Sequence, residues 1–406
     1  MSTPLHLSPQ IVLYQIFSIC LQYILLDLQK KLLEKIFEEK KETTLFTSLC
    51  TFQSNQSSQI FSGHFEKFWP TFGLHFGFLQ TIVSTFLPIN KDIDFKTENV
   101  VDPDDVKVGI TIAWPFYKDK QKQENISYKE NVFVFILPGL TGEPSSSYIN
   151  YLVDQCIQNH LQPIVYNYRV FSPSLRLNPE EDVDIIHDLE FTLQYIKKKF
   201  PNHSIYGIGH SYGANQIVNY MGQYKEASLF EAGISLGNPY NMTVSSEHIR
   251  GTVFDFLMAK VLSKGLLRVK DALKEVELER GFNIEEAMRA KKVYDFDHNI
   301  TRHLYGYESV AAYYEHFGSS NKVGTIKKPL LGISSIDDDV CTMKAIPQEE
   351  FKNNENLILY LTPRGGHIGW VEGPIWNMRP WFPRPCIQFI KSIIELQEKQ
   401  QQQKTY

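Results

Sequence analysis

The 406-residue sequence lacks the cysteine patterns of a disulfide framework or a structural zinc site. Its cysteines are scattered, and none forms a Cys-x-x-Cys pair or a cluster with histidine. They are Cys20, Cys50, Cys156, Cys341 and Cys386. Long basic tracts are also absent, and 41 basic against 46 acidic residues leave a formal net charge of −5 at pH 7. We therefore expect no nucleic-acid partner and no bound metal.

Apolar residues are plentiful: 43% of the chain is hydrophobic and 13% aromatic, which suits a sizeable core. Short apolar runs typical of parallel strands alternate with helical patterns. Strands are expected at residues 131–137, 163–168, 204–208, 232–236, 329–334 and 356–361. Helices are expected at about 147–159, 182–200, 214–224 and 385–399. This alternation predicts an α/β fold with a doubly wound, mostly parallel sheet.

The segment from about 240 to 327 interrupts this alternation, because it is helical in pattern, rich in lysine and longer than a simple crossover. We interpret it as a helical cap over the functional site, with a purely structural insertion as the alternative. The main domain would then cover residues 61–396. The Gln-rich end, residues 397–406, is predicted to be disordered.

Residues 1–60 form a separate N-terminal region in this interpretation. Residues 11–28 are 18 mostly apolar residues followed by Lys30 and Lys31, near the lower length limit of a membrane span. A cleaved signal peptide is disfavoured, since there is no charged segment before the apolar run and no clear cleavage site. Polar residues on one helical face also suit a helix lying in the membrane interface, or one packed on the protein. We predict membrane association through residues 11–28, by spanning or by lying on the bilayer.

The most informative motif is Gly209-His210-Ser211-Tyr212-Gly213, which matches Gly-x-Ser-x-Gly. An expected strand precedes it and an expected helix follows, which is the setting of a nucleophile elbow. In such a turn the serine is exposed at a strained tip, and small flanking residues let the backbone pass tightly. An ordinary glycine-rich turn is the alternative.

A serine nucleophile needs a base and an acid that orients the base. After the strand at 329–334 come Asp337, Asp338 and Asp339, and after the next strand comes His367 on a glycine-rich loop. Both groups follow strand ends, where ligands bind in open sheets. We favour Asp337 as the acid, although spacing alone does not choose among the three aspartates.

The negative oxygen of a tetrahedral intermediate also needs hydrogen-bond donors. The residue after the nucleophile supplies one backbone N–H, here that of Tyr212. A loop after an earlier strand supplies the second, and Pro138-Gly139-Leu140-Thr141-Gly142 is placed to do so. We predict the Leu140 N–H as this donor.

Together these motifs resemble the eukaryotic α/β-hydrolase-domain lipases that include medium-chain phospholipases and medium-chain fatty acid ethyl ester synthase/esterases. The resemblance runs from about residue 68 to 394. It rests on FLQTI (78–82), LPGLTG (137–142), NYR (167–169), GHSYGAN (209–215), GNP (237–239), FDHNIT (296–301), GYESVAAYY (306–314) and GGHIGWVEG (365–373). It implies the α/β-hydrolase fold, an N-terminal membrane segment, and no metal or organic cofactor.

The resemblance assigns Ser211 as nucleophile and His367 as base. The family's acid is the first of an Asp-Asp pair ten residues before a proline, here Pro347, which selects Asp337. Asp339 and Tyr212 depart from the residues usual in the family.

The implied substrates are fatty acyl esters, of medium chain or within phospholipids. We therefore predict a serine ester hydrolase that works through an acyl-enzyme on Ser211. Acyl transfer to an alcohol stays open as an alternative because it shares this intermediate. An inactive hydrolase-fold scaffold is the other alternative, although all three catalytic residue types are present.

Overall fold

The structure is a computed structural model that describes residues 52–53, 67–100, 110–168 and 183–404. The predicted membrane-associating segment, residues 11–28, lies outside these residues. Among the helices that are described, none has the length and apolar character needed to cross a membrane.

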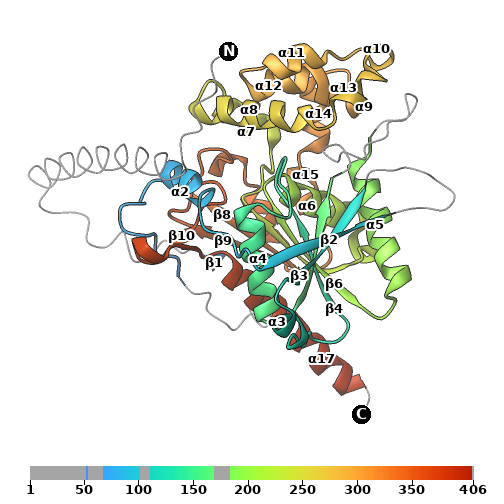
Figure 1. Ribbon diagram of the computed structural model, residues 1–406, viewed down its shortest axis with the longest axis vertical. Coiled ribbons are helices and arrows are strands. Elements are labelled where there is room, and N and C mark those ends of the chain that lie inside the picture. Colours follow the sequence, from blue (N-terminus) through green and yellow to red (C-terminus); the bar gives the residue numbers. More distant parts are fainter. Residues whose placement is uncertain (1–51, 54–66, 101–109, 169–182, 405–406) are drawn as a thin grey trace, which may run out of the picture.

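A nine-stranded sheet forms the centre of the molecule, with the strand order β1-β9-β8-β7-β6-β4-β5-β3-β2 (Figure 1). The six central strands β4 to β9 pair in parallel. At one edge β3 joins β5 and β2 joins β3 in antiparallel pairs, and at the other edge β1 joins β9 in an antiparallel pair. The strands are β1 (Phe52–Gln53), β2 (Ile93–Asn99), β3 (Thr111–Tyr117), β4 (Val132–Leu137), β5 (Gln162–Asn167), β6 (Ser204–His210), β7 (Phe230–Leu236), β8 (Leu330–Ser335) and β9 (Leu357–Thr362). A separate hairpin pairs β10 (Val371–Glu372) with β11 (Arg379–Pro380).

Helices cover both faces of the sheet, as the continuous apolar strands require. Every side chain of β4 is buried, and successive ones enter two different cores. Phe133 and Phe135 join the core that contains α5 (Ile185–Lys199) and α6 (Tyr212–Tyr224). Val134 and Ile136 join the core that contains α4 (Ser147–Gln158) and α17 (Pro383–Lys404).

The predicted fold class is confirmed, and all six predicted strands and four predicted helices are present within a few residues of their expected bounds. Two features differ. The antiparallel strands β2 and β3 were not among the predicted strands. The final helix α17 continues to Lys404, so the predicted disorder from residue 397 is wrong up to that residue. The Gln and Lys residues of this segment are good helix formers, which lets the helix extend beyond the protein body.

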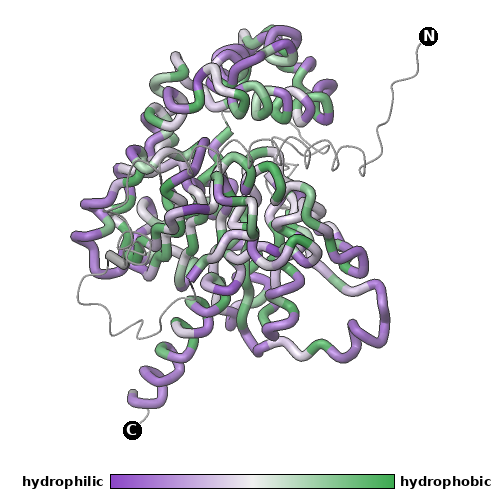
Figure 2. The backbone as a smooth tube through the Cα atoms, turned by 90° about the vertical axis from the view of Figure 1, so that its left-hand side faces the viewer, coloured by the Kyte–Doolittle hydropathy of each residue, from purple (hydrophilic) through white to green (hydrophobic). Residues whose placement is uncertain are grey.

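Residues 240–327, which we call the cap, contain helices and no strand, and the structure describes this segment in full. The cap lies at one end of the molecule, opposite the C-terminal end of α17 (Figure 1). Apolar and polar residues alternate along most of the cap segment (Figure 2). Its helices are α7 (Met242–Ile249), α8 (Val253–Leu267), α9 (Lys270–Lys274), α10 (Glu277–Arg280), α11 (Ile284–Arg289), α12 (Val293–Phe296), η4 (Asp297–Thr301), α13 (Arg302–Leu304), α14 (Val310–Phe317) and α15 (Ser320–Val323).

The remaining helical segments are short and lie outside the cap. They are α2 (Gly77–Ser84), α3 (Lys120–Glu124), η3 (Lys225–Ala227), η5 (Met343–Ala345), α16 (Gln348–Asn353) and η6 (Ile375–Asn377). Of these, α2 matters most for the site, because it lies against the loop that carries His367.

Candidate active site

Ser211 lies in the turn between β6 and α6, as predicted, and its backbone conformation is strained. Its φ of 50° and ψ of −110° place a non-glycine residue in a sparsely populated region. The turn is held because the Ser211 N–H donates a hydrogen bond to the Leu236 carbonyl of the neighbouring strand, at 2.8 Å. This geometry projects the side chain from the carboxyl end of the central strand.

The two motif glycines are required by close backbone contacts. A Cβ on Gly209 would lie 2.4 Å from the Gly213 carbonyl oxygen. A Cβ on Gly213 would lie 2.4 Å from the carbonyl oxygen of Leu137 and 2.5 Å from that of Pro138. Backbone atoms cannot turn aside as the end of a side chain can, so both positions exclude side chains.

His367 meets Ser211 across the site. Its Nε2 lies 2.9 Å from the Ser211 Oγ, within hydrogen-bond distance. Its backbone N–H donates to Thr81 Oγ1 of α2 at 2.7 Å, which fixes the position of the loop. Thr81 therefore positions the histidine, a role that sequence reasoning missed although Thr81 lies within the FLQTI motif.

The carboxylate that contacts the His367 ring is that of Asp338, whereas the sequence analysis favoured Asp337 as the acid. His367 Nδ1 lies 3.0 Å from Asp338 Oδ2. The other carboxylate oxygen of Asp338 accepts hydrogen bonds from the backbone N–H groups of Val340 and Cys341, at 2.8 and 2.7 Å. These bonds hold the carboxylate, which is buried, in one orientation toward the imidazole.

Asp337 lies next to this arrangement and supports the loop instead. Its Oδ1 accepts hydrogen bonds from Ser335 Oγ at 2.5 Å and from the Gly366 N–H at 3.0 Å. Its Oδ2 lies 3.7 Å from Arg364. One residue of offset in the turn after β8 thus decides which aspartate reaches the imidazole.

Asp339 completes the acidic run without contacting the histidine ring in a hydrogen bond. Burial, together with the negative charges of Asp338 and Asp337, raises the pKa of Asp339 to about 6.

Asp338, Cys341 and His367 form a group of side chains that could in principle bind a metal ion. Their potential ligand atoms lie within 4.8 Å of one another, and no other such group is found among the described residues. Burial raises the pKa of the Cys341 thiol, and Asp338 already bonds His367. We therefore interpret this group as part of the hydrogen-bonded site rather than as a metal centre.

The residues that carry the two predicted oxyanion donors, Tyr212 and Leu140, line the same cavity as Ser211. Tyr212 begins α6, and the first N–H groups of a helix have no partner within the helix. Leu140 follows Gly139, where an added Cβ would lie 3.6 Å from Ser211 Cβ, so this loop passes beside the serine. Neither the Tyr212 nor the Leu140 N–H donates a backbone hydrogen bond to another residue that the structure describes.

Ser211, Tyr212 and Leu140 line a cavity whose other walls come largely from the cap. Apolar side chains dominate these walls, among them Met242, Ile249, Met258, Leu262, Leu266, Val293, Phe296, Ile300 and Leu304. A few polar residues interrupt the apolar lining, including Ser245 and Asp297. Burial raises the pKa of Asp297 to about 6, and Tyr314 Oη donates a hydrogen bond to its carboxylate at 2.7 Å.

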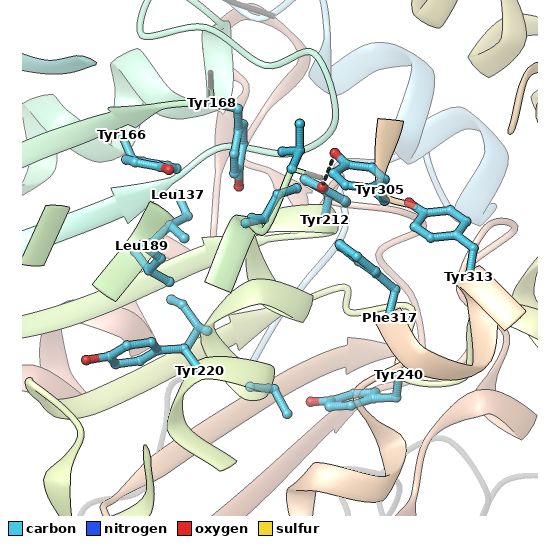
Figure 3. Packing of buried hydrophobic residues seen from close by; sticks show 14 of the residues in the cluster. Leu137, Tyr166, Tyr168, Leu189, Tyr212, Tyr220, Tyr240, Tyr305, Tyr313 and Phe317 are labelled. Carbon is cyan, nitrogen blue, oxygen red and sulfur yellow. Dashed lines mark hydrogen bonds between the residues drawn. The ribbon is translucent and has the colours of Figure 1, made fainter. Parts of the chain in front are cut away.

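Aromatic side chains join the nucleophile's helix to the cap (Figure 3). The hydroxyl oxygens of Tyr212 and Tyr305 lie 3.2 Å apart, and Tyr305 stacks on Tyr313 with ring centres separated by 5.6 Å. Tyr168 contacts Tyr212 from the sheet side, edge to face. Burial raises the pKa of Tyr212 well above its ordinary value, so its phenol stays neutral. The residue that follows the nucleophile therefore anchors the cap as well as beginning α6.

His210, between Gly209 and Ser211, is fully buried against the rings of Tyr148 and Phe382. Neither of its ring nitrogens has a hydrogen bond of good geometry. Burial lowers the pKa of His210 to about 3, and the nearby backbone of Leu137 offsets this lowering only in part. The folded protein thus holds this side chain neutral, whereas the unfolded chain protonates it near pH 6.5.

This difference makes part of the stability depend on pH. The free energy of unfolding keeps its full contribution from neutral His210 above pH 6.5. This contribution is lost as the pH falls toward 3, because the unfolded state binds a proton that the folded state does not. At pH 5 the loss amounts to about 2 kcal/mol. We expect His210→Phe to remove this pH dependence. Between pH 7.5 and pH 5 the free energy of unfolding, measured by denaturant titration, should then fall less for the variant than for the wild type. An equal fall in both proteins would contradict this account.

Comparison with known proteins places the chain in a family. The family model of the alpha/beta hydrolase fold matches residues 132–374, more than half of the 406 residues. Embryogenesis-associated protein EMB8 of Picea glauca is 30% identical over 65% of this chain and 59% of its own length. Phospholipase ABHD3 of Homo sapiens is 24% identical over 81% of this chain and 80% of its own.

Monoacylglycerol lipase of Saccharomyces cerevisiae is also similar, with 28% identity over 64% of this chain and 58% of its own length. This chain therefore spans less than two thirds of the spruce and yeast proteins. The family match runs from β4 to just beyond His367, so it includes the parallel strands together with Ser211, His367 and Asp338. The chain belongs to the α/β-hydrolase fold family.

Proposed function

We propose that this protein is a carboxylic ester hydrolase that cleaves fatty acyl esters through an acyl-enzyme on Ser211. The observation that carries the proposal is the hydrogen-bonded row Ser211–His367–Asp338 beside an apolar cavity. Three side chains from loops after β6, β8 and β9 converge there, although they are far apart in sequence. A hydrolase-fold scaffold without activity would not need this convergence.

The geometry supports a two-step reaction. His367 Nε2 takes the proton of Ser211 Oγ as the oxygen attacks the ester carbonyl carbon, and Asp338 stabilises the resulting imidazolium. The Tyr212 and Leu140 N–H groups bind the oxyanion of the tetrahedral intermediate. The C–O bond to the alcohol then breaks, and His367 returns the proton to the leaving oxygen. Water, deprotonated by the same histidine, releases the fatty acid and regenerates Ser211.

The substrate class follows from the cavity and from the relatives. The largely apolar walls suit an acyl chain, because burying methylene groups is favourable by about 0.8 kcal/mol each. Two of the relatives are named a phospholipase and a monoacylglycerol lipase. We propose lipid esters as substrates, with medium-chain acyl groups or phospholipids as the finer expectation, and membrane association through residues 11–28.

A fluorophosphonate probe tests the proposal, because it reacts with activated serines. We expect the full-length protein to be labelled at Ser211, as identified by peptide mass spectrometry. We also expect hydrolysis of p-nitrophenyl esters to rise with acyl length and then fall when the chain exceeds the cavity. Absence of labelling and of ester turnover in a well-folded sample would reject the hydrolase and favour a scaffold.

A further inference from the structure

Helix α8 of the cap is apolar on both its inner and its outer side. Its inner side chains Met258, Leu262 and Leu266 line the cavity beside Ser211. Five large apolar side chains on its outer side are between 38% and 60% exposed, namely those of Val253, Phe256, Leu257, Val261 and Leu267. A surface helix of a soluble protein ordinarily carries polar residues on its outer side. Exposed apolar side chains gathered along one helix are typical of a surface that binds another protein or a membrane.

The exposed apolar surface continues from α8 onto α2. Phe78 of α2 is itself exposed, and its ring contacts that of Phe254 at the start of α8, with ring centres 5.3 Å apart. One turn further along α2, Thr81 accepts the hydrogen bond that positions His367. Of the two helices that present this surface, α8 lines the cavity and α2 supports the loop that carries His367.

A second group of exposed aromatic side chains comes from the segment just before α2 and from η6. Trp69, Phe72 and Trp376 are 70%, 79% and 88% exposed. Trp69 and Trp376 lie near each other in the fold, because Pro70 forms a β-bridge with Glu372. Tryptophan at such exposure is uncommon on a soluble surface, and its amphipathic ring suits the boundary between lipid and water.

Cationic groups accompany the apolar side chains. Lys260 and Lys264 are exposed on α8, and the Lys260 ammonium lies 5.5 Å from the centre of the Phe256 ring. Exposed lysines beside apolar side chains are the pattern of a helix that lies in a lipid headgroup layer, where ammonium groups meet lipid phosphates. A protein partner would not require this combination.

We propose that the outer side of α8, Phe78, Trp69, Phe72 and Trp376 form a docking surface for a lipid bilayer. The inference rests on the proposed lipid-ester substrate, because α8 would then separate the bilayer from the acyl cavity by the width of one helix. The apolar segment 11–28, through which we propose membrane association, precedes Trp69 in the sequence.

The test compares a soluble ester with the same chemistry at a lipid surface, using the full-length protein. The variant Phe256→Ser/Leu257→Ser removes two outer side chains and leaves the cavity walls intact. We expect its rate on p-nitrophenyl laurate embedded in phosphatidylcholine vesicles to fall about tenfold or more. Its rate on water-soluble p-nitrophenyl butyrate should stay within about twofold of the wild type.

The matched control is Leu278→Ser, since Leu278 is the most exposed large apolar side chain of the cap at 94% and lies on α10 instead of α8. We expect both of its rates to match those of the wild type. An equal effect of the control and the double variant on the vesicle rate would overturn the docking surface. So would a double variant with unchanged vesicle activity, or one whose main effect is to dissociate an oligomer in light scattering.

Tryptophan fluorescence gives a second measurement that does not depend on turnover. Of the other three tryptophans, Trp370 and Trp381 are fully buried, and Trp114 is partly buried in β3, where its indole N–H donates to Glu98. Lipid-dependent changes therefore report chiefly on the exposed Trp69 and Trp376. We expect vesicles of brominated phosphatidylcholine to quench the wild type, and Trp69→Phe/Trp376→Phe to lose most of that quenching. Quenching that survives in this variant would place the contact elsewhere. A wild-type protein that does not hydrolyse p-nitrophenyl butyrate would instead reject the proposed function. Failure of the docking surface and failure of the proposed function are therefore distinguishable.

Discussion

Asp338→Asn should lower kcat by about 10⁴-fold on any ester substrate, whereas Asp337→Asn should lower it far less. The asparagine fits the space of Asp338 but can present an N–H to His367 Nδ1, which favours the wrong tautomer of the imidazole. It also removes the negative charge that stabilises the imidazolium during attack. Steady-state kinetics with p-nitrophenyl butyrate measure both losses.

Asp337→Asn provides the matched control, because the same change is made one residue earlier in the same turn. Asp337 accepts from Ser335 and from the Gly366 N–H, so its replacement disturbs the loop that carries His367 without touching the ring. We expect a loss of roughly tenfold, the order of one hydrogen bond to a charged group. The reverse ranking of the two variants would return the acid to Asp337 and refute the contact that we assign to Asp338.

The choice between these aspartates illustrates what the sequence could and could not predict. That an acid follows β8 and a histidine follows β9 is visible in the order of apolar runs and polar loops. Which of three consecutive aspartates turns toward the histidine depends on the backbone of the turn. There, the N–H groups of Val340 and Cys341 select Asp338, and no spacing rule contains that information.

The sheet was predictable in its parallel part and less so at its edge. β4 is a run of six buried apolar residues, which can hardly be anything other than a central strand. β2 reads Ile-Asp-Phe-Lys-Thr-Glu-Asn and has just two side chains of strongly apolar character. Its alternation was the available signal, but Pro115 in β3 weakens a strand interpretation of its partner. The structure accommodates Pro115 beyond Thr111–Ala113, the part of β3 that pairs with β5.

The walls of the cavity were beyond reach of the sequence for a different reason. The cap was expected from its length and helical pattern, but the side chains that line the cavity come from several separate segments, among them α7, α8, α12 and η4, each of which contributes only a few. Asp297, for instance, reads as an ordinary polar residue of the FDHNIT motif, and the structure buries it against Tyr314. Such neighbours are set by tertiary packing rather than by any periodicity along the chain.

Ser211→Ala should reduce kcat by about 10⁴-fold or more, and the double variant Ser211→Ala/His367→Ala should be no slower than that. Once the nucleophile is gone, the histidine has no proton to take, so its further loss costs nothing. Independent contributions would instead multiply, and the double variant would then be slower than either single variant by the other's full factor. Multiplying losses would mean that the 2.9 Å contact between Ser211 and His367 is not a functional pair.

KM gives the complementary half of this last experiment. The alanine at position 211 removes one oxygen and leaves the apolar cavity and the two backbone donors in place, so ground-state binding of the ester should change little. A large fall in kcat with a nearly constant KM is the signature of an interaction made in the transition state. A rise in KM with kcat preserved would assign Ser211 to substrate binding and leave the chemistry to another group.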